Sequence, residues 1–233
     1  MTLSSDRPKL IGFYSSPIGK KIITGVTGLG LSLFVLVHMA DNLTLFVSSK
    51  AYNQLAHQIN SMGLLLYIIE LTLLALVIFH AVMGIAIKFN ARQARPIGYE
   101  RIKSAGAPSK QSISSRTMII TGLILLVFLG FHLSTFKFGA YYSTTINGIE
   151  MRDLASLVIE KFHQPMYAFG YAGVVTLLGF HLRHGIWSGF QSLGISNSRI
   201  SPIIYSMGLI LAVAIAFGFL ILPLAVYFGW IAN

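Results

Sequence analysis

Long apolar runs, separated by short polar segments, dominate the sequence. Five of these runs are long enough to form transmembrane helices, because a helix of about 20 residues crosses a hydrocarbon core of ~30 Å. We therefore predict an all-α integral membrane bundle of five transmembrane helices, which forms a single domain over residues 1–233. The five predicted spans are Ile22–Ala40, Leu64–Phe89, Thr117–Phe136, Met166–Phe190 and Ile203–Ile231.

The polar segments between the runs predict what lies at the two membrane surfaces. Ser48–Ser61 is rich in Asn, Gln and Ser and predicts a short interfacial helix, whereas Ala91–Ser115 contains Pro and Gly and predicts a loop. The first run follows Lys20 and Lys21, as the core of a signal peptide would. No cleavage site with small residues follows it, so we expect a retained span.

Basic residues are distributed unequally between the segments that join the spans. If the spans alternate in direction, 13 of the 17 Lys and Arg residues lie on the side of the N-terminus and four lie on the other side. The positive-inside rule then predicts a cytoplasmic N-terminus and an external C-terminus, in a bacterial cytoplasmic membrane. Because topology accounts for the net charge of +10, no nucleic-acid partner is predicted.

The composition restricts the chemistry that the chain can carry. Hydrophobic residues make up 55% of it and charged residues 10%, and there is no cysteine. Thiolate-ligated iron–sulfur clusters and cysteine nucleophiles are therefore excluded for this chain. Any metal must take nitrogen or oxygen ligands.

Four of the apolar runs each contain a deeply placed histidine. The histidines are His38, His80, His132 and His181, and each lies 16 or 17 residues from the edge at which its run begins. An ionisable side chain inside a membrane span is costly, which makes it a candidate functional residue. Neutral imidazole is also a common ligand of haem iron.

The depths of these histidines sort them into two levels. Sixteen residues of helix correspond to about 25 Å of travel. Since the first and third spans run outward and the second and fourth run inward, His38 and His132 form an outer pair and His80 and His181 an inner pair. We interpret the pairs as the iron ligands of two b-type haems. The second nitrogen of each ring is expected to donate to a backbone carbonyl one turn earlier on its own helix.

Other interpretations of the four histidines remain open. They could be polar contacts between helices, a proton relay in a proton-coupled transporter, or part of an anchor without haem. A divalent-metal site is less well supported, because it requires three or four ligands at one level and Glu70 is the only acidic residue inside a predicted span. The transporter also lacks support from inverted repeats or broken helices.

Motifs around the four histidines resemble one family, the five-helix, di-haem cytochrome b subunit that anchors succinate dehydrogenases and fumarate reductases. Their order and spacing cover most of the chain. Asn42, four residues after His38, and the polar stretch Ala51-Tyr52-Asn53 also fit this pattern. The matching motifs are Thr27-Gly28-Leu29, His38-Met39, Phe79-His80-Ala81-Val82, Phe131-His132-Leu133 and His181 with Gly185-Ile186-Trp187.

The resemblance implies a non-catalytic electron-transfer subunit of an oxidoreductase complex. It implies haem ligation by His38, His80, His132 and His181. It also implies two partners on the cytoplasmic face, a flavoprotein subunit with FAD and an iron–sulfur subunit, together with a membrane quinone (menaquinone or ubiquinone) as substrate. Cytochrome b anchors of formate dehydrogenases or hydrogenases are the alternative within this class.

The quinone site is only loosely indicated by the sequence. Some family members carry an acidic residue in the first outer loop, where this chain has Asn53 and His57. His184 follows His181 by three residues and therefore faces nearly the same side of the helix. These three residues, Asn53, His57 and His184, are the candidates for quinone contacts.

Overall fold

Five long helices form the body of the protein in the computed structural model, which describes residues 9–94, 112–195 and 197–231. All five are long and apolar enough to cross a membrane. The predicted fold class, a helical integral membrane bundle with five spans, is therefore confirmed. The helices are α2 (Pro17–Leu43), α4 (Leu64–Gln93), α5 (Ile113–His132), α7 (Pro165–Ser192) and α8 (Ile200–Tyr227).

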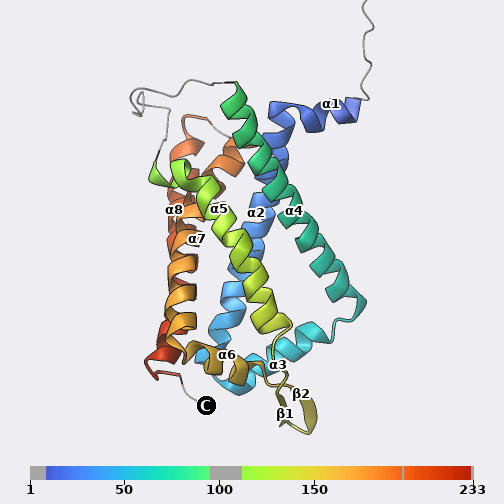
Figure 1. The fold of residues 1–233 in the computed structure, drawn as a ribbon, viewed down its shortest axis with the longest axis vertical. Coiled ribbons are helices and arrows are strands. Elements are labelled where there is room, and N and C mark those ends of the chain that lie inside the picture. The colour runs from blue at the N-terminus through green and yellow to red at the C-terminus, as the bar shows by residue number, and fades with distance from the viewer. Residues whose placement is uncertain (1–8, 95–111, 196, 232–233) are drawn as a thin grey trace, which may run out of the picture.

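The first four long helices surround a shared centre, and α8 packs on the outside of α7 and α2 (Figure 1). Neighbours around this ring are α4 and α2, α2 and α7, and α7 and α5, while α4 and α5 meet only sparsely. The two diagonals, α2 with α5 and α4 with α7, make at most slight backbone contact. In the middle of the ring, α2 faces α5 and α4 faces α7, and the backbones of these helices are too far apart for close contact.

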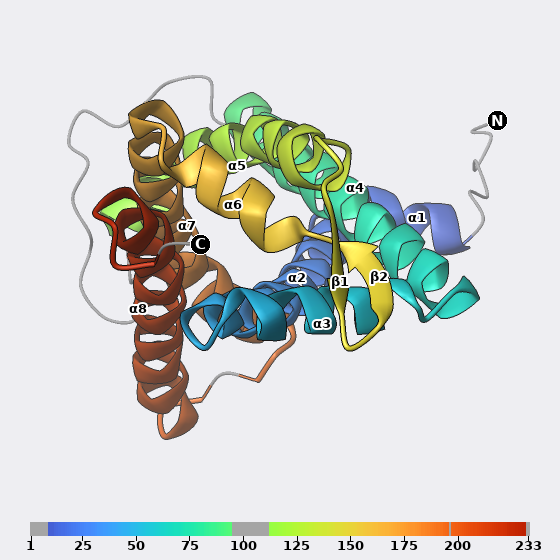
Figure 2. The same cartoon turned by 90° about the horizontal axis from the view of Figure 1, so that it is seen from below.

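Short elements close one end of the bundle and form what we call the platform. It consists of α3 (Ser49–Asn60), β1 (Ser143–Ile146), β2 (Ile149–Arg152) and α6 (Leu154–Phe162). Figure 2 shows α3 and α6 lying across this end, with the hairpin beside them. The largest buried apolar cluster joins α3 and α6 to α7 and α8 through residues such as Tyr52, Val158 and Tyr171. At the opposite end lies α1 (Lys9–Ser15).

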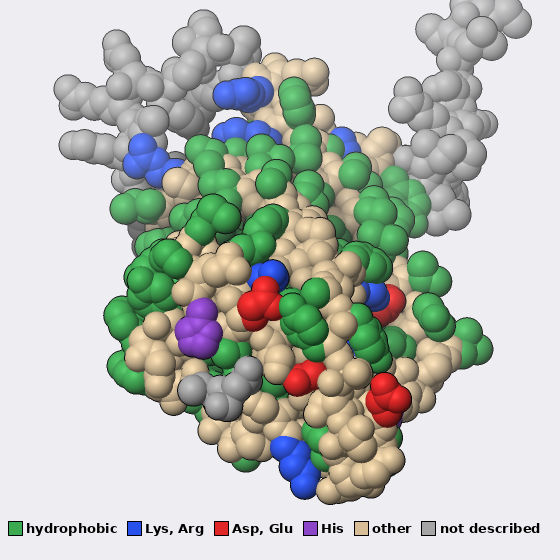
Figure 3. All heavy atoms as spheres, turned by 60° about the horizontal axis from the view of Figure 1, so that its bottom comes forward, with side chains coloured by type: hydrophobic (Ala, Val, Ile, Leu, Met, Phe, Trp, Pro, Cys, Tyr) green, Lys and Arg blue, Asp and Glu red, His purple; other side chains and the backbone are tan. Residues whose placement is uncertain are grey.

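The surface agrees with a membrane setting. Large apolar side chains on the long helices are exposed, for example Leu64, Leu71 and Val127. Hydrophobic side chains cover the flanks in Figure 3, and acidic side chains appear toward the platform. The predicted interfacial helix at Ser48–Ser61 is confirmed as α3. Most of the predicted loop at Ala91–Ser115 lies outside the described residues, but α4 continues to Gln93 and α5 begins at Ile113.

A β-hairpin departs from the expected purely helical architecture. Its strands pair antiparallel, with Ile146 opposite Ile149, and the turn between them is Asn147-Gly148. Both turn residues have positive φ, 51° and 78°. This is the two-residue turn that Asn-Gly favours, because Asn and Gly tolerate the left-handed region best. The dipeptide is a hairpin signal that hydropathy alone does not reveal.

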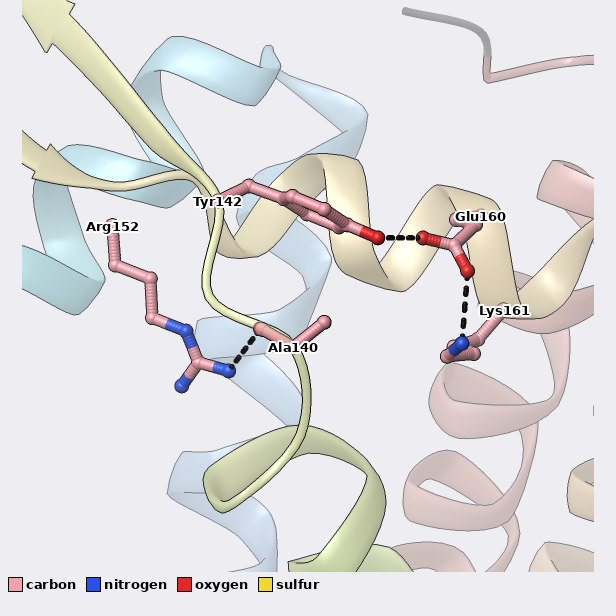
Figure 4. A network of polar contacts seen from close by, with 5 residues as sticks. All are labelled: Ala140, Tyr142, Arg152, Glu160 and Lys161. Carbon is pink, nitrogen blue, oxygen red and sulfur yellow. Dashed lines mark hydrogen bonds and ion pairs between the residues drawn. The ribbon is translucent and has the colours of Figure 1, made fainter.

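The hairpin leads into α6 through a group of polar contacts. Arg152, on β2, donates to the carbonyls of Ala140 and Lys137 at 2.9 and 3.3 Å and so caps the chain that leaves α5 (Figure 4). The phenol of Tyr142 donates to Glu160 on α6, which also pairs with Lys161. The segment after α5 is thereby fixed to the platform.

A π-helical turn, η2 (Leu133–Lys137), follows directly after His132. Such turns are rare and change the direction of the side chains that follow. Lys137, at the end of η2, forms an ion pair with Glu70 on α4. This contact links two helices that otherwise meet only sparsely, and it gives the single acidic residue of the predicted spans a partner.

Asn53 and Asp153 connect the two helices of the platform. The amide of Asn53 donates to Asp153 at 2.8 Å and accepts from the backbone N–H of Ala155 at 2.9 Å. Asp153 is the N-cap of α6 and accepts from the backbone N–H of Ser156 at 3.1 Å. Burial pushes the pKa of Asp153 up, but the hydrogen bonds from Asn53 and Ser156 outweigh it and leave the pKa below its usual value.

We expect Asp153→Ala to lower the stability of the protein, because it removes the cap of α6 and the acceptor of Asn53. Loss of an N-cap costs about 1 kcal/mol. The lowered pKa means that the carboxylate stabilises the fold above the pKa that it has in the unfolded chain. This contribution disappears as the pH falls through the lowered pKa.

Thermal melts of the detergent-solubilised protein, followed by circular dichroism at neutral and at acidic pH, measure the loss of stability and its dependence on pH. Glu150→Ala, at an exposed acidic residue of the same hairpin, is the matched control. A melting temperature of Asp153→Ala equal to that of the control at neutral pH would contradict the assignment of the cap.

Candidate functional site

The inner pair of histidines lies across one diagonal of the bundle. His80 projects from α4 and His181 from α7, and their ring centroids are 6.1 Å apart with the planes inclined at 68°. Their Nδ1 atoms are held by the other two helices of the ring. His80 Nδ1 lies 3.2 Å from the carbonyl oxygen of Thr24 on α2, and His181 Nδ1 lies 3.1 Å from the hydroxyl of Thr121 on α5.

These contacts correct one expectation drawn from the sequence. The second ring nitrogen was expected to meet a carbonyl one turn earlier on its own helix, but for the inner pair it meets a neighbouring helix instead. In each case the ring points away from its own helix toward the helix packed against it, α2 for His80 and α5 for His181. With Nδ1 engaged, Nε2 is the nitrogen left to act as a ligand in each ring.

The outer pair lies across the other diagonal, nearer the platform. His38 on α2 and His132 on α5 have ring centroids 5.8 Å apart with planes inclined at 84°. Phe34 stacks on His38 at 5.5 Å and 11°. Aromatic rings surround His132 as well: those of Phe128, Phe136 and Tyr171.

One buried polar atom of the outer pair has no partner among the described residues: Nδ1 of His132. A buried imidazole nitrogen without a hydrogen bond is costly, since it has lost water and gained nothing. If both rings are neutral, the pair contains nitrogens that can accept a bond from a further group. The donor set, two imidazoles per level, fits an iron porphyrin that takes one axial ligand from each side.

The spacing within each pair also fits this group. The rings of each pair face each other across the bundle with centroids 5.8 and 6.1 Å apart, so His38 with His132 and His80 with His181 would each hold one such group between them. Among the described residues, no group of three or more His, Asp or Glu residues could hold a metal ion, which disfavours the divalent-metal interpretation.

Glycines beside the inner pair fall into two kinds. At Gly28 and Gly122 a Cβ atom would lie 2.8 and 3.3 Å from Cε1 of His80 and His181, so these two glycines admit the imidazole rings. At Gly84 and Gly185, one turn after the same histidines, a Cβ atom would meet nothing within 4 Å. Both are only partly exposed. This leaves open space beside each inner histidine, as a flat macrocycle requires.

The two pairs lie at different levels of the bundle. Thr24, which contacts His80, and His38 are 14 residues apart on α2, which corresponds to about 21 Å along the helix. Thr121, which contacts His181, and His132 are 11 residues apart on α5, or about 17 Å. The distance between the level of the inner pair and the level of the outer pair is therefore similar along α2 and along α5.

The three candidates for quinone contacts lie in different surroundings. Asn53 is 3% exposed and both ends of its amide are engaged by α6, which favours a structural role. His57 is half-buried on the same helix, α3. His184 is half-buried on α7, one turn beyond His181 toward the end of the bundle opposite the platform. The structure does not bring these three residues together.

Sequence reasoning missed the threonines that hold the inner histidines. Thr27 and Thr121 are buried, and the hydroxyl of Thr27 lies 3.4 Å from His80 Nδ1. Thr27 belongs to a motif noted in the sequence, but threonine in a membrane helix commonly bonds to its own helix, as Thr27 also does to Ile23. Only the packing of α2 on α4 shows its second contact.

Comparison with known proteins supports the resemblance. No family model matches the chain, and no solved structure matches it. The succinate dehydrogenase cytochrome b558 subunit of Bacillus subtilis (strain 168) is 27% identical to it over 198 residues, which are 84% of this chain and 88% of that protein. The similarity therefore extends over most of the chain rather than one helix. It confirms that the chain resembles the cytochrome b membrane anchor of succinate dehydrogenases along most of its length.

Proposed function

We propose that the chain is the membrane-anchor subunit of a succinate:quinone oxidoreductase and that it holds two b-type haems. The observation that carries the proposal is the presence of two histidine pairs, each spanning a diagonal of the bundle with ring centres about 6 Å apart. The similarity to a succinate dehydrogenase cytochrome b558 subunit supports the choice of complex.

Each pair has a defined role in this proposal. His80 and His181 would hold the inner haem, and His38 and His132 the outer haem. When bound, the haems supply one-electron transfer between the iron–sulfur subunit and a quinone in the membrane. The protein itself supplies ligation, separation of the two sites and an apolar environment. The threonines fix the rings of the inner pair so that Nε2 is available.

The distribution of charge supports the proposed orientation. Among the described residues, the end of the bundle that carries α1 also carries most of the basic side chains, among them Lys20, Lys21 and Arg183. We place this end in the cytoplasm, where the flavoprotein and iron–sulfur subunits would dock, and the platform outside, in a bacterial cytoplasmic membrane. Several further basic residues belong to residues 95–111, which lie outside the described part of the chain.

The alternatives find less support in the geometry. A proton-coupled transporter that uses a histidine relay requires a connected path, but the two pairs are about 17–21 Å apart along the helices. Among the described residues, no acidic group forms a hydrogen bond or ion pair with any of the four rings. The similarity to a succinate dehydrogenase subunit argues against an anchor of a formate dehydrogenase or hydrogenase.

The first test is a reduced-minus-oxidised visible spectrum of the protein purified from membranes, with haem counted per polypeptide. We expect two b-type haems per chain. A colourless protein, or one with a single haem, would contradict the two-site proposal.

Single substitutions separate the two sites. We expect His132→Ala to remove the outer haem, because His132 is one of its two ligands, while most of the inner haem remains. His181→Ala should give the reverse result. Redox titration of the visible spectrum distinguishes the two haems by their potentials. Loss of the same haem in both variants would show that the pairing is wrong.

The open space beside His80 offers a test of the macrocycle itself. In the polypeptide alone, a Cβ atom added at Gly84 would meet no atom within 4 Å. If a haem fills that space, Gly84→Leu should eliminate the inner haem while the chain still inserts into the membrane. Gly173→Leu is the matched control, because Gly173 is exposed on α7 and equally free of close neighbours. Retention of both haems in Gly84→Leu would show that the space faces lipid instead.

A further inference from the structure

Tyr52 is a buried residue of α3 whose hydroxyl group reaches toward the outer histidine pair. It is 8% exposed and packs in the cluster that joins the platform to α7 and α8. Its phenol donates a hydrogen bond to Asn42 Oδ1 at 3.1 Å. Burial, assisted by nearby Asp41 and opposed by Arg152, raises the pKa of this phenol far above neutrality. Tyr52 is therefore a permanent hydrogen-bond donor.

Asn42 passes this contact on to His38. Its Nδ2 donates to the backbone carbonyl of His38 at 2.8 Å and lies 3.4 Å from both ring nitrogens. The oxygen end of the same amide is held by Tyr52. Because both ends are engaged, the amide plane has one preferred orientation against the imidazole ring.

The ring of His38 is thus confined from two sides. Phe34, one turn before it, stacks nearly parallel to it at 11°, and Asn42, one turn after it, lies against its nitrogens. Residues four apart share a face of a helix, so α2 alone provides both walls. Phe219 of α8 and His132 of α5 also lie near the ring, each with centroids 5.8 Å from it. Tyr52 is the residue from outside α2 that hydrogen-bonds Asn42, and so it fixes the amide that forms the second wall.

The inner pair has a different kind of support. His80 and His181 are held directly by Thr24 and Thr121 of the long helices. No hydrogen bond among the described residues connects the platform to either of them. A change at Tyr52 should consequently affect one site and leave the other unchanged.

We infer that Tyr52 is a positioning residue for the outer haem, which acts on His38 through Asn42. The inference rests on the proposed function, since it presupposes that His38 is an axial ligand. The orientation and hydrogen bonding of an axial imidazole tune the electronic structure and potential of the iron. Removal of the hydroxyl group that holds Asn42 should therefore be visible in the spectrum of one haem.

Tyr52→Phe tests the inference in the complete complex. The substitution retains the ring that packs in the platform and removes only the hydrogen bond to Asn42. We expect both haems to remain bound, with a shift in the midpoint potential and low-spin electron paramagnetic resonance signal of the outer haem only. A residue with a merely structural role would lower the melting temperature without moving these signals. Tyr67→Phe, at an exposed tyrosine on α4, is the matched control.

A second variant shows whether Asn42 transmits the effect. Asn42→Ala should shift the same haem, and the double variant with Tyr52→Phe should shift it no further, because both changes break one chain of contacts. Additive shifts would mean that Tyr52 acts by another route and would overturn the inference. Should Tyr52→Phe fail to accumulate in membranes, Asn42→Ala still tests the contact from its other end.

The outcomes separate this inference from the proposed function. If the unmodified complex contains no haem in this chain, the proposed function fails. If it contains two haems and Tyr52→Phe changes neither, or changes both equally, the function stands and the positioning role of Tyr52 is wrong.

Discussion

The cost of placing an imidazole in a hydrocarbon environment is the constraint on which the rest of the structure depends. The inner rings meet it through hydrogen bonds to Thr24 and Thr121. All four rings also face a second histidine across the bundle, where our proposal places a shared cofactor. The pairs lie on the diagonals, so the helices that carry them cannot approach each other closely. This explains why neighbours around the ring pack tightly while the centre is left to side chains and, in our proposal, to two cofactors.

Hydropathy and helix geometry were sufficient to predict the spans and to sort the histidines into two levels. The length of a span and the depth of a histidine within it are both distances along one helix, and the number of residues determines such a distance directly. The hairpin and α6 were not predicted from apolar runs, because both are too short to span a membrane. Their local signals are the turn at Asn147-Gly148 and the cap at Asp153. The threonine contacts were missed for a related reason. Thr121 bonds to its own helix as well as to His181, and only the packing of α5 on α7 reveals the second partner.

Asn53 illustrates why polar residues in short loops are hard to interpret from one sequence. Its position in the first outer loop suggested a quinone contact. In the structure its amide is saturated by Asp153 and Ala155, which lie about a hundred residues later in the chain. Burial of Asn53 therefore depends on the start of α6, and no pattern in the sequence around Asn53 indicates that α6 lies next to it. The neighbouring Tyr52 gave no separate signal, although its hydroxyl contacts the residue that adjoins His38.

The two histidine pairs differ in what supports them, and this difference has consequences for how the sites can vary. The inner rings are held by Thr24 and Thr121, within helices whose positions are fixed by packing along their whole length. The outer pair relies on elements outside the long helices: α3 on one side, and on the other the hairpin, where Arg152 caps the segment after His132. Substitutions in the platform can therefore alter one site without disturbing the membrane helices. In the proposed function, two cofactors of the same chemistry would acquire different properties in this way, because only the outer histidine pair is coupled to the platform.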